Sequence, residues 1–488
     1  MRISGVFPAA SKQVTGSFLT GRFSECSTAL RLGKAVRNAP NLSPLFGLCL
    51  FFLSFPLAAQ SKPATENWPQ WRGPLGSGVS RESGLPTRWG ANENIAWKAP
   101  LAGLGTSSPI VWGDQIFVTS QVGDTIVRAG AHPKLARDDA SLVVNEHPIG
   151  GHRAESPSDP AQVFLAVEAF DQSGERLWIH QTAATGEFPE LHEKHNLATP
   201  TPVTNGEFVY AWFGNGQVVC LDMQGHLIWK RHLGLEYSPF DSQWGHGSSP
   251  VLFEDLLILL CDHRSASYLL ALDGKSGEER WRVERGAGRV SHSTPLVVSG
   301  PFGNELVVNS SVRLDTYDPA TGSLRWYAGS PRQTPIPSPV FHDGVIYMSR
   351  GYRNSDFLAI RPGGQGDVSE SHLLWRTPNG ASYVPSILYY NGLLYMTNEV
   401  GVVTCAEART GETLWRQRLQ GIFFASPVAG DGNVYLVSET GTTFVLLAGT
   451  EPRLVARNDL GERLIASLAI SGDQLFLRSD GTLFAIGR

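Results

Sequence analysis

The stretch LDGKSGEERW at residues 272–281 places an acidic residue, a turn, a glycine and a tryptophan in one short phrase. The same phrase returns as FDQSGERLW at 170–178, LDMQGHLIW at 221–229, YDPATGSLRW at 317–326 and AEARTGETLW at 406–415. In every copy the tryptophan comes four residues after the glycine, as in Gly277 and Trp281. A repeat of about 40–50 residues made of short strands is typical of a β-propeller or a related array.

Each copy of the phrase has a direct physical interpretation as a turn between two strands. The acidic side chain can bond its own backbone, and the glycine can adopt a positive φ at no steric cost. The tryptophan then lies in the next strand, where its large ring can fill the seam between neighbouring sheets. We expect this structural role, rather than ligand stacking, for seven tryptophans: Trp97, Trp178, Trp229, Trp281, Trp326, Trp375 and Trp415.

Two further phrases repeat in step with the first and complete a unit of four strands, A to D. A small-residue cluster followed by an apolar stretch, as in SSPVL at 248–252, occurs in eight copies, and a second apolar run such as LLILLC at 256–261 follows each. The last unit lacks strand D, but the run NIAWK at 94–98 precedes the first unit and can supply it. We predict an all-β, eight-bladed β-propeller of four-stranded antiparallel blades over residues 94–488, closed by this N-terminal strand without an open edge.

The first 59 residues differ from the repeat and resemble a targeting segment. Six basic residues and one acid come before an apolar run at 45–59, which ends in small residues. This order is typical of a secretory signal peptide with a long n-region, and the run is too short for a comfortable membrane span. We expect residues 1–59 to be a signal peptide, 60–93 a strap leading into the ring, and 121–161 an insertion. The expected product is a periplasmic or secreted monomer and not an integral membrane protein.

Charge and cysteine content narrow the classes of partner. The chain has 40 lysine and arginine residues against 45 aspartate and glutamate residues, and removal of residues 1–60 leaves a net charge of −10. A net negative charge argues against nucleic acid as the main partner. Three cysteines remain after this removal, Cys220, Cys261 and Cys405, without the spacing of a metal site. Buried thiols are favoured, and one disulfide in an oxidising compartment is left open.

The repeated phrase, as in ALDGKSGEERW at 271–281, resembles the blade motif of the pyrroloquinoline-quinone (PQQ)-like β-propeller repeat family. The resemblance extends from NWPQWRGP at 67–74 to FAIG at 484–487. This family includes both the outer-membrane-assembly lipoprotein BamB and the quinoprotein dehydrogenases. The resemblance therefore implies a fold and leaves the activity open.

The longest non-repeating segments are expected on one face of the ring. In a four-stranded meander, the B–C loops and the connections from D to the next A share a face, and the acid-glycine turns lie on the other. Long loops on a rigid scaffold usually carry function. Eight residues on or near these segments are our candidates for binding a ligand or partner at the mouth of the central channel: His195, Trp244, His246, His292, Arg350, Tyr352, Arg353 and Tyr383. A metal site at His246 and His292 is a weaker alternative, and polar side chains that only bond loop backbones are another.

Signatures of catalysis are missing from the chain. In quinoprotein dehydrogenases the resemblance would imply PQQ between a tryptophan and a disulfide of adjacent cysteines, with a calcium ion, but this chain has no adjacent cysteines and no haem CxxCH. No GxSxG, HExxH or Walker phrase is present either. We therefore expect a non-catalytic scaffold that docks a protein partner on one face. The alternative is a small-molecule-binding protein or enzyme, such as a quinone- or metal-dependent oxidoreductase, with its site at the channel mouth.

Overall fold

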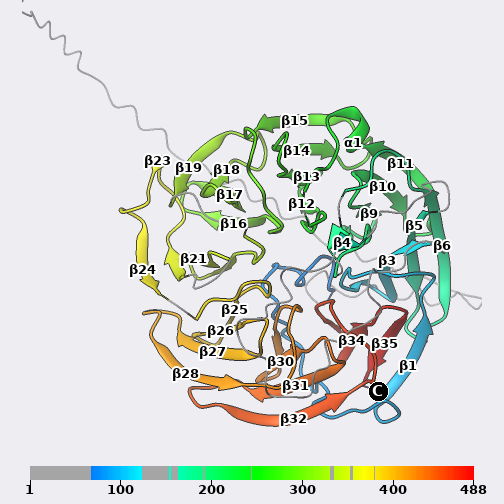
Figure 1. The fold of residues 1–488 in the computed structure, drawn as a ribbon, viewed down its shortest axis with the longest axis vertical. Helices are drawn as coiled ribbons and strands as arrows, with labels where there is room; N and C mark the ends of the chain where they lie inside the picture. The colour runs from blue at the N-terminus through cyan, green and yellow to red at the C-terminus, as the bar shows by residue number, and fades with distance from the viewer. Residues whose placement is uncertain are drawn as a thin grey trace, which may run out of the picture. The chain divides into compact units, whose positions relative to one another are not determined.

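The computed structural model shows β-sheets arranged around a ring, with each sheet forming one blade (Figure 1). It describes residues 67–123, 153–154, 163–189, 191–192, 194–242, 244–329, 335–351, 356–378 and 380–487. The predicted eight-bladed β-propeller of four-stranded antiparallel blades is confirmed. Much of the predicted insertion at 121–161 lies outside the described residues.

The first four blades follow one another along the chain. Blade 1 contains β2 (Ile110–Trp112), β3 (Gln115–Val122), β5 (Phe164–Phe170) and β6 (Arg176–Ala183). Blade 2 contains β8 (Val203–Thr204), β9 (Phe208–Trp212), β10 (Gln217–Asp222) and β11 (Leu227–His232). Blade 3 contains β12 (Val251–Phe253), β13 (Leu256–Cys261), β14 (Tyr268–Asp273) and β15 (Glu279–Glu284). Blade 4 contains β16 (Leu296–Gly300), β17 (Gly303–Asn309), β18 (Leu314–Tyr317) and β19 (Leu324–Ala328).

The remaining blades complete the ring. Blade 5 contains β20 (Val340–His342), β21 (Val345–Ser349), β22 (Phe357–Ile360) and β24 (Leu373–Thr377). Blade 6 contains β25 (Leu388–Tyr390), β26 (Leu393–Thr397), β27 (Val402–Glu407) and β28 (Thr413–Arg418). Blade 7 contains β29 (Val428–Gly430), β30 (Asn433–Val437), β31 (Thr442–Leu447) and β32 (Arg453–Asp459). Blade 8 contains β33 (Ala469–Ser471), β34 (Gln474–Arg478), β35 (Thr482–Ile486) and β1 (Ile95–Pro100).

Four short elements lie outside this pattern. β4 (Arg153–Ala154) pairs with β7 (Leu191–His192), and α1 (Leu233–Glu236) follows β11. β23 (Gly366–Asp367) runs parallel to β19 as a fifth strand of blade 4. Within the part of the chain that the structure describes, no helix has the length and apolar character needed to cross a membrane.

The tryptophans of the repeated phrase contact the glycine turn of the next blade. Trp229 in blade 2 donates its indole N–H to the carbonyl oxygen of Gly274 in blade 3, at 2.8 Å. A Cβ atom on Gly277 would lie 2.7 Å from the Trp229 ring, and Gly277 has a φ of +73°. The glycine of each phrase therefore contacts the preceding blade, and the tryptophan four residues later contacts the next blade. Equivalent indole bonds join Trp97 to Gln172, Trp178 to Met223, Trp281 to Pro319, Trp375 to Ala408 and Trp415 to Gly449.

Trp326 departs from this pattern because its neighbour, blade 5, has a different C–D connection. Its indole N–H donates to a carboxylate oxygen of Glu305 in its own blade, at 2.8 Å. The backbone N–H of Gly363, in the glycine-rich connection of blade 5, donates to the same oxygen at 3.3 Å. The Trp326 side chain is fully buried. A carboxylate therefore takes the place of the backbone carbonyl at this seam.

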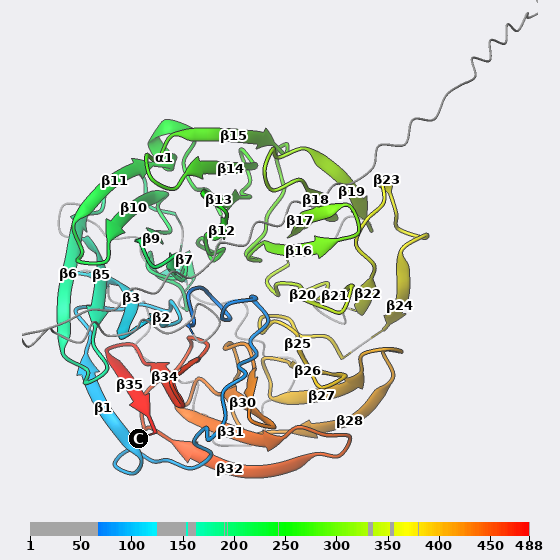
Figure 2. The same ribbon diagram turned by 180° about the vertical axis from the view of Figure 1, so that it is seen from behind.

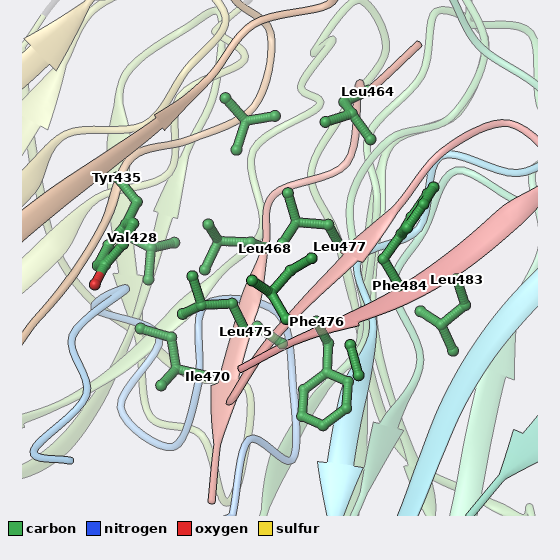
Figure 3. Packing of buried hydrophobic residues seen from close by; sticks show 14 of the residues in the cluster. Val428, Tyr435, Leu464, Leu468, Ile470, Leu475, Phe476, Leu477, Leu483 and Phe484 are labelled. Carbon is green, nitrogen blue, oxygen red and sulfur yellow. The ribbon is translucent and has the colours of Figure 1, made fainter. Parts of the chain in front are cut away.

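The N-terminal strand β1 pairs antiparallel with β35 and becomes the outer strand of blade 8. Trp97 lies opposite Ala485 in this pairing. Leu475 and Phe476 of β34 and Phe484 of β35 are buried in a cluster that spans blades 7, 8 and 1 (Figure 3). Burial of apolar side chains across these blades stabilises the closed ring.

The segment before β1 crosses the inner ends of several blades (Figure 2). Trp68 bridges to Val111 of blade 1, and Val79 bridges to Ala429 of blade 7. Trp68 is 1% exposed. These contacts attach the residues that precede the ring to its first and seventh blades.

Candidate functional site

The central channel is lined by the residues that lead into the inner strands. A cavity of about 140 Å³ lies here, with lining residues from all eight blades. Strand A of each blade enters from the face that carries the connections from strand D and the B–C loops, which we call the connection face. The residues just before each inner strand therefore define the wall of the cavity near this face.

A ring of hydroxyl groups holds the inner strands together. From blade 1 to blade 7, the backbone N–H of each member donates to the side-chain oxygen of its counterpart in the next blade, at 2.7 to 3.0 Å. The members, from blade 1 to blade 8, are Ser108, Thr201, Ser249, Thr294, Ser338, Ser386, Ser426 and Ser467. Because hydrogen bonds satisfy these buried groups, the wall of the channel is fixed in place.

At the seam between blades 8 and 1, a buried arginine joins the two blades. Arg478 in β34 donates to the hydroxyl oxygen of Ser107 at 2.6 Å and to that of Ser120 at 3.2 Å. Its side chain is 1% exposed. Sequence reasoning missed Arg478, although the corresponding positions of the other copies, such as Thr119 in QIFVTS, are uncharged.

A second ring of side chains lies two residues before the hydroxyl ring and forms the upper wall of the cavity. Its members are Thr106, Thr199, Gly247, His292, Ile336, Val384, Phe424 and Ile465. Blades 1 to 4 contribute the polar or small members, and blades 5 to 8 contribute the apolar members. We call this set the upper ring. The cavity therefore has one polar side and one apolar side, and Trp71 from the N-terminal segment also lines it.

Lys194 reaches the cavity from the connection between blades 1 and 2. Its ammonium group pairs with Glu439 of blade 7 at 3.0 Å and lies 4.0 Å from the centre of the Phe424 ring. Arg463 pairs with the same carboxylate at 2.6 Å. This contact joins the connection between blades 1 and 2 to blade 7. Sequence reasoning did not identify Lys194, because its partner is far away in the chain.

Two of the predicted histidines meet at the cavity. His195 and His292 both line it, and their ring centres are 5.9 Å apart. His292 is 7% exposed, and neither of its ring nitrogens has a hydrogen-bond partner among the described residues. Burial, and then the nearby His192, lower the pKa of His292 to about 4. His292 is therefore a neutral imidazole at pH 7, with both a donor and an acceptor to offer.

His246 lies behind the wall, among aromatic rings. The centre of its ring is 4.1 Å from that of Trp212 and 5.3 Å from that of Phe240. Burial, followed by His292 and His263, lowers its pKa well below the usual value. Within the described ranges, no group of three or more histidine, cysteine, aspartate or glutamate side chains is arranged to hold a metal ion. The predicted metal pair His246 and His292 thus consists of one residue in the cavity wall and one residue behind it.

The other candidates are distributed around the connection face. Trp244 makes an edge contact with His192, with 5.5 Å between ring centres. Tyr383 comes one residue before Val384 of the upper ring and is partly exposed. Arg350 is 8% exposed and pairs with Asp356 at 3.4 Å. Tyr352 and Arg353 lie outside the described residues.

Arginines gather where blades 3, 4 and 5 reach the connection face. Arg285 makes a two-pronged contact with Asp262, at 2.8 and 3.1 Å. Asp315 pairs with Arg285, Arg289 and Arg313. Asp356 pairs with Arg350 and Arg376. Five arginines therefore share three carboxylates, and we call this group the arginine cluster: Arg285, Arg289, Arg313, Arg350 and Arg376.

The residues of the channel do not fit PQQ. The cavity of about 140 Å³ is close to the size of a cavity that holds a single benzene ring, whereas PQQ has three fused rings and three carboxylates. The cysteines Cys220, Cys261 and Cys405 are free, and each is buried in a different blade. They therefore provide no disulfide against which a quinone could stack.

Comparisons with known proteins support the architecture and identify relatives. A family model described as outer membrane protein assembly factor BamB matches residues 165–406 and 399–487. The protein of that name from Moranella endobia (strain PCIT) is 24% identical over 352 residues, which cover 67% of this chain and 83% of the relative. The protein of that name from Yersinia pestis is 23% identical over 342 residues, covering 66% and 80% respectively.

Solved structures of enzymes share the fold at low sequence identity. Quinohemoprotein alcohol dehydrogenase from Comamonas testosteroni has a TM-score of 0.59 at 11% identity, covering 87% of this chain and 81% of the enzyme. A europium-containing methanol dehydrogenase has a TM-score of 0.58 at 11% identity, covering 86% and 90%. At this level of identity the likeness concerns the fold alone.

Proposed function

The chain belongs to the family of PQQ-like repeat propellers described as outer membrane protein assembly factor BamB, and on this premise we propose that it is a non-catalytic extracytoplasmic scaffold. Its connection face binds a protein partner, and the arginine cluster is the observation that carries this assignment. The propeller holds the cluster in a fixed position, and the partner supplies complementary charge.

The charge of the cluster is opposite to that of the chain as a whole. The full sequence has a formal net charge of −5, whereas five arginines share three aspartates on this part of the connection face. The buried carboxylates fix the guanidinium groups, and Arg376 keeps a side chain that is 48% exposed. Fixed positive charge steers an acidic partner and fixes its orientation more than it adds affinity.

We further propose that residues 1–59 direct the chain out of the cytoplasm. The basic segment and the apolar run at 45–59 support this role, as does the outer-membrane name of the relatives. N-terminal sequencing of the protein purified from its own host checks the proposal. A mature chain that begins near residue 60 is expected, and a mature chain that retains the apolar run would contradict it.

Matched arginine variants on the two faces test the docking face. Arg313→Ala and Arg376→Ala remove charge from the connection face, while Asp315 and Asp356 each keep another arginine. Arg280→Ala and Arg325→Ala are the controls, because these arginines pair with Asp273 and Asp318 at the acid-glycine turns on the opposite face. Each pair of substitutions is combined in one double variant.

Chemical cross-linking in the cell envelope, followed by mass spectrometry, gives the readout. The connection-face double variant is expected to lose most of the cross-links of the wild type to its partner at low salt, and the difference from the wild type is expected to shrink at high salt because exposed charge is screened. The control double variant is expected to keep them. Equal cross-link profiles for both double variants, with circular dichroism showing intact folds, would place the docking surface elsewhere.

A further inference from the structure

The axial cavity has features of a ligand site that partner docking does not require. Its volume of about 140 Å³ matches a ligand of one small ring or a short branched chain. It is lined by the upper ring, by Lys194 near the connection face and by Trp71 from the N-terminal segment. A ligand of this size would contact residues of several blades at once.

The two sides of the cavity differ in chemistry. Thr106, Thr199 and His292 line the side formed by blades 1 to 4, together with His195, and the ammonium group of Lys194 lies across the cavity at Phe424 of blade 7. The side formed by blades 5 to 8 carries Ile336, Val384, Phe424 and Ile465. A ligand that satisfies both sides has a polar end and an apolar body.

None of the described residues that line the cavity is acidic. The described titratable groups near His292 are His192, Lys194 and His195 from one connection, and His246 from the next. Glu439, the described carboxylate that pairs with Lys194, also pairs with Arg463, which in turn pairs with Asp480. The buried ring nitrogens of His292 have no hydrogen-bond partner among the described residues. An unpaired buried polar group costs free energy, which a bound group that accepts hydrogen bonds would recover.

We propose that the axial cavity binds a small monocarboxylate, with its carboxylate against His292 and Lys194 and its apolar body against blades 5 to 8. The ligand adds a carboxylate to a lining without a described acidic residue, and Ile336, Val384 and Ile465 select for the hydrocarbon body. This site is independent of the docking role, since the arginine cluster and the upper ring share no residue.

Binding of a carboxylate is coupled to uptake of a proton. His292 is neutral in the free protein at pH 7, and a carboxylate beside it favours the imidazolium form, so its pKa rises on binding. Affinity is therefore expected to increase as the pH falls from 7 to about 5.5, where the ligand itself still carries its charge.

Isothermal titration calorimetry with isobutyrate and benzoate tests this site. The matched neutral probes are isobutyramide and benzamide, which have the same shape without the charge. For probes with so few atoms, dissociation constants of roughly 0.1 to 1 mM are expected. Titrations at pH 6 in two buffers of different ionisation enthalpy, MES and Bis-Tris, measure the proton uptake. The acids are expected to bind at least about tenfold more tightly than the amides.

Two variants separate the polar side from the apolar side. His292→Gln is expected to abolish proton uptake and weaken binding of the acids at least about tenfold. Val384→Phe fills the cavity and is expected to prevent binding while leaving His292 in place. The control is His226→Gln, because His226 lies at an acid-glycine turn on the other face with a side chain that is 78% exposed.

Other outcomes overturn the proposal. Equal binding of acids and amides would show a neutral apolar site, and absence of any binding at about 10 mM would show that the cavity holds only water. If His292→Gln does not fold, the imidazole nitrogen signals of the wild type decide the question by NMR. They are expected to move to imidazolium values on titration with isobutyrate, and unchanged signals would refute the site. Neither outcome affects the cross-linking test of the connection face.

Discussion

Trp281 and Gly322 illustrate how single residues hold neighbouring blades together. The Trp281 indole donates to the carbonyl oxygen of Pro319 in blade 4, at 3.2 Å. A Cβ atom on Gly322 would lie 2.7 Å from the Trp281 ring, and the φ of +73° at this glycine also disfavours other residues. A tryptophan and a glycine from consecutive copies of the repeat thus form one contact.

Trp281→Ala is expected to lower the free energy of unfolding by about 3 kcal/mol, because it leaves a cavity at the seam and an unbonded carbonyl. Urea denaturation followed by circular dichroism measures the change. Leu324→Ala is the control, since Leu324 is 47% exposed and its loss should cost less than about 0.5 kcal/mol. A loss for Trp281→Ala no larger than that of the control would rule out a docking role.

At the residue scale, the period of the strands separates the two histidines that the sequence placed together. Counting back from the hydroxyl ring, His292 lies two residues before Thr294, and Gly247 lies two residues before Ser249. Alternate residues of a strand point to opposite sides. His292 therefore faces the cavity, whereas His246 is shifted by one residue and packs against Trp212. This alternation is visible in the sequence once the repeats are aligned on the hydroxyl position.

The acid-glycine turn is the element that recurs at the end of the C strand in blades 1, 2, 3, 4 and 6. Asp273 accepts hydrogen bonds from Arg280 and from the backbone of Ser276, and these contacts lower its pKa to about 2. Asp171 is held in the same way, with the hydroxyl of Ser173 as the largest cause of its lowered pKa. Each ionised aspartate fixes the turn that receives a tryptophan from the preceding blade.

Acid is expected to weaken these turns within a defined range of pH. A carboxyl group with a lowered folded-state pKa stabilises the fold above its ordinary pKa of about 4, and this contribution is lost as the pH falls through about 2. The urea midpoint of the wild type should therefore decline between pH 4 and pH 2. Asp273→Asn should be less stable at pH 7 and show a smaller decline. A decline of the same size in both proteins would exclude Asp273 as a contributor.

At the element scale, most of the fold follows from local sequence. The strands and turns of one blade lie within about fifty residues, and the number of repeats gives the number of blades, so spacing alone predicts them. The contact between Lys194 and Glu439 and the contact between Arg478 and Ser107 join residues from distant parts of the chain. Neither contact follows from a local pattern, because each depends on the path of a connection across the assembled ring.

The whole molecule depends on the pairing of β1 with β35. Without β1, strand β35 would present an unpaired edge, and exposed edges promote association between chains. Trp97 would also be lost from its bond to Gln172 in blade 1, at 2.8 Å. Loss of β1 is therefore expected to destabilise the whole ring.

Deletion of residues 1–100 is expected to produce aggregates or a chain with a much lower urea midpoint. Deletion of residues 1–66 is the matched control, because it retains β1 and the segment that begins at Asn67. Size-exclusion chromatography with light scattering distinguishes the two proteins. A monomeric product of the longer deletion with an unchanged midpoint would show that β1 is dispensable.

The pairing of β1 with β35 also determines when, during synthesis, the ring can close. A ribosome makes β1 before every other strand of the ring, and makes its partner β35 after all of them. Until then Trp97 has no sheet to join, and blade 8 exists only as fragments at both ends of the nascent chain. An export machinery that requires an unfolded passenger would therefore meet a chain that cannot finish folding early. A message truncated before β35 would yield a product marked for quality control by its open edge.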